Sequence, residues 1–68
     1  MTNLFKAEVA YVDDSEKFNL FSDNKDQLVN ILCAMVFRNP GLYLVIPIYN
    51  CRNKLVGYVG DDGRFKEA

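Results

Sequence analysis

The chain offers few side chains of the kinds that perform chemistry. It contains no histidine, so acid–base catalysis would fall to carboxylates or lysine. Two pairs of adjacent carboxylates, Asp13-Asp14 and Asp61-Asp62, stand in turn-type segments, where aspartate bonds to the local backbone and does not converge with its neighbour on a substrate. No serine or cysteine has a recognisable base nearby. We therefore expect a protein that is not an enzyme and has no catalytic residue.

The cysteines and glycines do not indicate a cofactor site. Cys33 and Cys51 lack the spacing of a zinc site, and the four glycines lack the spacing of a phosphate-binding loop. Cys51 stands beside Arg52, which leaves a reactive thiol open, although a spectator role is the alternative that we favour. Two cysteines without a secretion signal are typical of the reducing cytoplasm. The sequence thus predicts no metal, no cofactor and no small-molecule substrate.

Hydrophobic periodicity predicts one small α+β domain over residues 1–68. Ser22 and Asp23 stand where a helix N-cap is wanted, and the helix should stop at Asn39, because Pro40 disfavours helical backbone in the residue before it. The expected elements are strands 4–12 and 18–21, a helix to about Arg38, strands 42–49 and 54–59, and an optional short strand 64–67.

This order of elements predicts the topology of the sheet. A right-handed crossover through the helix places the third strand beside the first, so the sheet order is second, first, third, fourth, with any fifth strand at the edge. Pro47 lacks an amide hydrogen, which predicts an edge or a bulge at that point of the third strand. We therefore expect a ββαββ(β) fold in which one helix packs on a four- or five-stranded antiparallel sheet and the other face of the sheet is open.

The helix is apolar on more than one side. At about 100° per residue, the faces separate into two groups. The aromatic side chain of Phe37 either tucks under a loop as the helix frays or contacts a second chain. The expected sheet-facing stripe is Leu28, Ile31, Leu32, Met35 and Val36 with Val29 on its border, and Cys33, Ala34 and Phe37 fall on the opposite side.

The third strand is apolar at every position, so both of its faces need cover. We expect Leu42, Leu44, Ile46 and Ile48 to face the helix, which places Tyr43, Val45 and Tyr49 on the open sheet face together with Tyr58. Tyrosines that gather in this way are typical of interface cores, because aromatic residues are enriched there. The alternatives are that the chain ends fold back over this face or that a symmetric dimer forms through the sheet or its edge.

Positive charge gathers in the carboxyl half of the chain. Residues 1–37 have a balance of −3 and residues 38–68 a balance of +2, which together give the formal net charge of −1. Arg52, Lys54, Arg64 and Lys66 stand near Tyr49 and Tyr58 and could contact phosphates, although solvated hairpin charges are the commoner explanation of such residues. Nucleic-acid binding through this basic hairpin is therefore the alternative function.

Chain length points to outside support for the fold. A domain of 68 residues has a small core, and such domains usually rely on a disulfide, a metal or an oligomer. The cysteine spacing and the lack of histidine argue against the first two, so the expected support is a protein partner or a second copy, most simply a homodimer. No stretch approaches the roughly 18 continuous apolar residues of a membrane span, so we expect a soluble cytoplasmic protein without a membrane partner.

The strand, strand, capped helix and strands joined by the Asp62-Gly63 turn resemble several small phage-encoded inhibitors, including some anti-CRISPR proteins and inhibitors of the host RNA polymerase. The resemblance lies in the order of elements, and it implies a viral protein that blocks a larger host assembly by surface contact in the host cytoplasm. The expected function is thus a non-enzymatic protein-binding module. Its expected contact residues are Phe37, Tyr43, Tyr49 and Tyr58 as aromatic anchors, with Arg52, Lys54 and Arg64 steering the approach.

Overall fold

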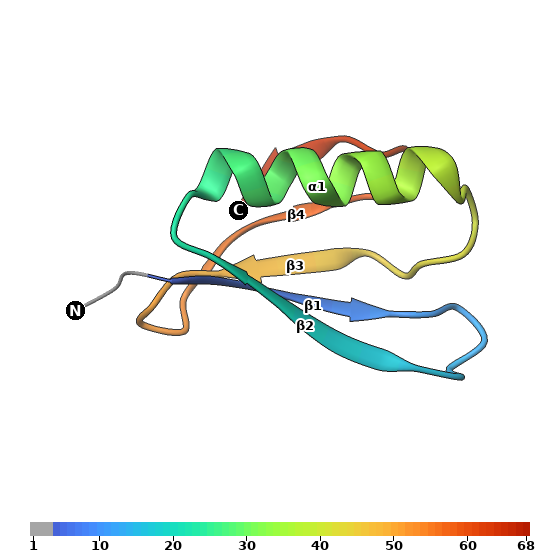
Figure 1. Cartoon of the computed structure of the whole chain (residues 1–68), viewed down its shortest axis with the longest axis horizontal. Coiled ribbons are helices and arrows are strands. Elements are labelled where there is room, and N and C mark those ends of the chain that lie inside the picture. The colour runs from blue at the N-terminus through green and yellow to red at the C-terminus, as the bar shows by residue number, and fades with distance from the viewer. Residues whose placement is uncertain (1–3) are drawn as a thin grey trace.

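A single helix lies across one face of a five-stranded antiparallel sheet in the computed structural model, which describes residues 4–68 (Figure 1). The portion of the predicted domain at residues 1–3 lies outside the described residues. In chain order the elements are β1 (Phe5–Ala10), β2 (Lys17–Ser22), α1 (Lys25–Arg38), β3 (Ile46–Tyr49), β4 (Leu55–Val59) and β5 (Phe65–Glu67).

The predicted topology is confirmed. The sheet order is β2-β1-β3-β4-β5, so the helix carries the chain from the edge strand β2 past β1 to β3. The sheet curls around the helix, with β4 and β5 behind it and β2 at the far border (Figure 1). The optional fifth strand is present and forms the second edge. The fold is therefore ββαβββ, with one covered and one uncovered sheet face.

The helix begins one residue later than expected. Asn24 is the N-cap, and its side-chain oxygen accepts a hydrogen bond from Gln27 N at 3.1 Å. The prediction that Ser22 and Asp23 cap the helix is wrong, because Ser22 Oγ instead accepts from Asn24 N at 3.1 Å and fixes the entry into the cap. The helix ends at Arg38 as predicted, and Asn39 caps it by donating its N–H to Met35 O.

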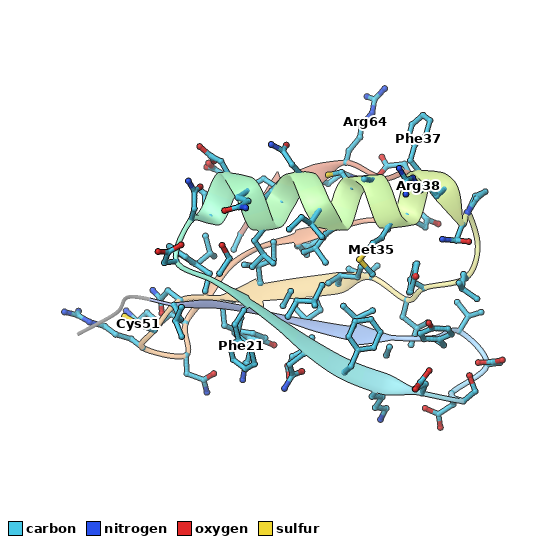
Figure 2. The ribbon with its side chains drawn as sticks, viewed as in Figure 1. Phe21, Met35, Phe37, Arg38, Cys51 and Arg64 are labelled. Carbon is cyan, nitrogen blue, oxygen red and sulfur yellow. The ribbon has the colours of Figure 1, made fainter. Side chains whose placement is uncertain are left out.

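The core lies between the helix and the covered sheet face. Leu28, Leu32 and Val36 are the buried helix residues, and they pack on buried side chains from β1, β3 and β4. Met35 and Val29 lie at the border of this core, and Figure 2 shows Met35 between helix and sheet. The sheet residues of the core are Ala7, Val9, Ile46, Ile48 and Val59.

The prediction of the sheet-facing stripe of the helix is wrong at one residue. Ile31 is 44% exposed, whereas Cys33, expected on the outer side, packs against the core. The helix is therefore rotated towards β5. The cause is tertiary, because Phe65 of β5 packs against the core at that side and covers Cys33.

The third strand is shorter than expected, because only Ile46–Tyr49 is regular strand. The preceding segment still lies beside the end of β1. It is held there by the bridge between Tyr11 and Tyr43 and by backbone hydrogen bonds, one of which runs from Leu44 N to Ala10 O at 2.9 Å. The irregularity expected at Pro47 is present, since regular pairing with β1 is confined to Ile48 and Tyr49. The expected orientation holds for Ile46 and Ile48, which are buried, but not for Leu44, which is 50% exposed.

The rotated stripe gives a direct test of the core. Replacing Leu32, which is fully buried, with alanine should lower the free energy of unfolding by about 2–5 kcal/mol, because a cavity remains in the core. Ile31→Ala is the matched control on the same helix and should cost far less. Urea unfolding followed by circular dichroism measures both. Equal losses in the two variants would contradict this packing.

Candidate functional site: the open face of the sheet

The face of the sheet turned away from the helix is uncovered by any described residue. Residues opposite each other in an antiparallel pair point to the same face, so the strand register identifies its members. We call this surface the open face. Its residues are Lys6, Glu8 and Ala10 of β1, Lys17, Asn19 and Phe21 of β2, Pro47 and Tyr49 of β3, Leu55 and Tyr58 of β4 and Lys66 of β5.

Two rows of side chains cross the open face. In the first row Lys6 is paired with Phe21 on one side and Tyr49 on the other. The Lys6 Nζ lies 5.4 Å from the centroid of the Tyr49 ring, within the range of a cation–π contact. In the second row Tyr58 is paired with Pro47 and with Lys66. Each row therefore combines apolar rings with one ammonium group.

Most rings of the two rows pack against their neighbours, and one ring protrudes. Tyr49, Tyr58 and Pro47 are half-buried by their neighbours, whereas Phe21 is 59% exposed and points away from the helix (Figure 2). Beside Phe21 lies a hollow of about 330 Å³ at the end of the sheet. It is lined by Leu4, Lys6, Phe21, Asn50, Cys51 and Asn53. A protruding ring next to a hollow offers complementary shape to another protein surface.

The expected tyrosine cluster is partly wrong. Tyr49 and Tyr58 lie on the open face as predicted. Tyr43 is buried in the core and packs edge-to-face against Tyr11, with ring centroids 5.2 Å apart. Tyr43 lies opposite Tyr11, whereas Tyr49 lies opposite Lys6. The register therefore shifts by one residue between these two pairs, and the shift turns Tyr43 to the face of the core. Phe21 was not among the expected contact residues. Alternation along β2 places it on the open face, because the neighbouring Leu20 faces the core.

The expected basic cluster is divided between the two ends of β4. Arg52 and Lys54 lie at the β3–β4 turn, where both backbone N–H groups donate to the Asn50 side-chain oxygen. Arg64 lies beyond the other end, where its carbonyl accepts from Gly60 N at 3.0 Å. The structure therefore does not bring these three cations into one patch.

Phe37 is separate from the open face. Its ring is 80% exposed and projects from the helix side of the molecule, near Arg38 and Arg64 (Figure 2). The interpretation that a frayed helix end tucks under a loop is wrong, because the helix is regular to Arg38. A hollow of about 260 Å³ lies beside it, lined by Val36, Phe37, Pro40, Asp61 and Asp62.

The carboxylates serve the backbone locally. Asp13 accepts from Ser15 N at 3.0 Å, and Asp62 accepts from Arg64 N at 3.1 Å, as predicted for turn aspartates. Hydrogen bonds from Ser15 lower the pKa of the Asp13 carboxyl, because they favour its charged form. Within residues 4–68 no group of three or more potential ligand residues could hold a metal ion.

Comparisons with known proteins do not assign this chain to a family. Comparison with protein families, with curated proteins and with solved structures gives no match to this chain. The helix α1, the one helix among residues 4–68, is not long and apolar enough to cross a membrane. The functional argument therefore rests on the surface itself.

The cysteines differ in surroundings and should differ in reactivity. Burial raises the pKa of the Cys33 thiol, the Phe65 N–H opposes this by lowering it, and the charge of Asp62 adds to the rise. Cys51 is exposed at a turn. Because the thiolate is the reactive form, iodoacetamide should modify Cys51 well before Cys33 near neutral pH.

Peptide mapping by mass spectrometry measures the two rates, and the unfolded chain in urea is the control in which the difference should disappear. A Cys33 that reacts as fast as Cys51 in the folded protein would contradict this assignment.

Proposed function

We propose that this chain is a non-enzymatic protein-binding module that covers a surface of a larger partner protein with the open face of its sheet. One observation carries the proposal: Phe21, Tyr49 and Tyr58 share a face that no described residue covers. Aromatic side chains of this kind supply most of the energy of protein interfaces. The hydroxyl groups of the tyrosines tolerate water before binding and offer hydrogen bonds after it.

Charge supports a protein over a nucleic acid as the partner. The open face carries Lys6, Lys17 and Lys66 against Glu8, so its cations are few and are spread over three different strands. A surface that follows a phosphate backbone would carry a continuous stripe of cations. Arg52 and Lys54 are instead separated from Arg64 by the length of β4, so they contribute charge only at the margins.

One observation favours the second candidate, binding of single-stranded nucleic acid. The Lys6 ammonium beside the Tyr49 ring matches a site where a base stacks on an aromatic ring and a cation meets the phosphate. Salt separates the two functions. Protein binding through aromatic rings should weaken modestly with salt, whereas nucleic-acid binding should weaken steeply.

The module has the features of an inhibitor that acts by surface contact. One aspartate of each pair, Asp13 and Asp62, bonds to the backbone of its own turn. An aromatic sheet face is suited to blocking a site on a larger assembly. A phage or mobile-element inhibitor in the host cytoplasm is the biological role that we propose for it.

Variants on the two faces test this function. Tyr58→Ala should reduce affinity for the partner by about tenfold or more, because a central ring is lost from the interface. Phe37→Ala removes a more exposed ring from the other side of the molecule and should leave the affinity unchanged. Affinity purification from the native host, with mass spectrometry of the retained proteins, identifies the partner, and titration of that partner gives the two affinities.

Circular dichroism should show that both variants remain folded. Loss of binding in Phe37→Ala alone would place the interface on the helix side. Retention of an oligonucleotide with a steep salt dependence, and of no protein, would favour the second candidate.

A further inference from the structure

The edge of the sheet at β2 presents unpaired backbone groups. β2 is the outermost strand, it pairs only with β1, and it extends over six residues without proline or bulge. Long, regular edge strands are templates for the addition of another strand, and proteins usually shield them. The argument uses the backbone groups of this edge, which the proposed function does not use, so the inference does not rest on that function.

The hydrogen bonds of the β1–β2 turn show which groups point outward. Tyr11 N donates to Glu16 O at 3.2 Å, which makes this a hydrogen-bonded pair. Such pairs alternate along an antiparallel ladder, so Phe18 and Leu20 direct their backbone groups to β1. The N–H and C=O groups of the residues between them therefore point away from the sheet. These residues are Lys17, Asn19 and Phe21.

The opposite edge is protected. β5 has only three residues, and the backbone N–H of Phe65 interacts with the Cys33 thiol of the helix. Lys25 of the helix also reaches this strand, with its Nζ 5.5 Å from the centroid of the Phe65 ring. Within residues 4–68, the long unshielded edge is therefore the one at β2.

We propose that β2 pairs antiparallel with β2 of a second copy of this chain, about a two-fold axis at Asn19. In this register Asn19 lies opposite Asn19 of the second copy, and Lys17 lies opposite Phe21 of the second copy. Every outward-pointing residue then meets another outward-pointing residue, and each such pair exchanges two backbone hydrogen bonds. The arrangement is isologous and closes on itself.

The side chains are self-complementary in the same register. On the open face the Lys17 ammonium comes beside the Phe21 ring of the second copy, which repeats the pairing of Lys6 with Phe21 within the chain. On the helix side Phe18 meets Leu20 of the second copy. Both are half-buried residues that border the core. No two like charges of β2 stand opposite each other.

The helix supplies further apolar surface at this edge. Ile31 lies about 200° around the helix from Cys33. Cys33 faces β5, so the exposed side chain of Ile31 lies on the flank that faces β2. Along the seam itself Phe18 and Leu20 provide apolar surface on the helix side, which a second copy would cover. The two open faces would join into one continuous surface of ten strands, five from each copy.

Charge at the two-fold position tests the register. Asn19→Lys and Asn19→Glu each place like charges opposite themselves and should weaken the dimer by about tenfold or more. An equimolar mixture of the two variants should restore dimers, because the opposed charges then attract. Asn19→Pro removes an outward N–H without touching the bonds to β1 and should also give monomers. Sedimentation velocity over a range of concentrations measures all of these, and Asn19→Ala is the control that should dimerise like the wild type.

Circular dichroism verifies that each variant is folded. The proposal is overturned if the wild-type chain sediments as a monomer at every concentration. It is overturned equally if the charged variants dimerise like the wild type or if their mixture remains monomeric. Tyr58→Ala should leave the dimer intact, so failure of the dimer and failure of partner binding through the open face give different results.

Discussion

The structure depends on one constraint, that a single helix can cover only one face of a five-stranded sheet. The apolar stripe of Leu28, Leu32 and Val36 meets the buried residues of the three central strands and so completes the core. Nothing else among residues 4–68 is left to cover the other face. The second sheet face is built in part from residues that tolerate water, and the tyrosines and lysines of the open face have that property.

The same constraint explains the unequal edges of the sheet. At the β5 edge the Cys33 thiol and the Lys25 side chain of the helix contact Phe65. These contacts protect that edge, whereas the β2 edge keeps its outward backbone groups. The open face and the β2 edge are thus both uncovered for the same reason, which is that a single helix covers the sheet. Both are the kinds of surface through which small domains gain stability from other chains.

The sequence was sufficient for the elements and their order, because periodicity, the Pro40-Gly41 stop and the Asp62-Gly63 turn are local signals. It was insufficient for faces that depend on tertiary contacts. Ile31 is exposed and Cys33 packs against the core, the reverse of the prediction, because Phe65 of β5 packs at one side of the helix. A helical projection of the sequence does not include such contacts with other strands. Tyr43 entered the core because the pairing shifts by one residue before Ile46, and an apolar run gives no sign of such a shift. Of the candidate site, Tyr49 and Tyr58 were predictable from alternation. The separation of Arg52 from Arg64 required the hairpin geometry.

The most direct test of the open face uses the four tyrosines as reporters. Tyr49 and Tyr58 lie on that face, whereas Tyr11 and Tyr43 pack against each other at the core. Fluorine magnetic resonance of the chain labelled with fluorotyrosine, recorded in buffer and in an extract of the native host, follows all of them at once. The account predicts that the Tyr49 and Tyr58 signals shift in the extract while those of Tyr11 and Tyr43 stay in place. Unchanged signals from Tyr49 and Tyr58 in an extract that retains the chain in a complex would contradict it.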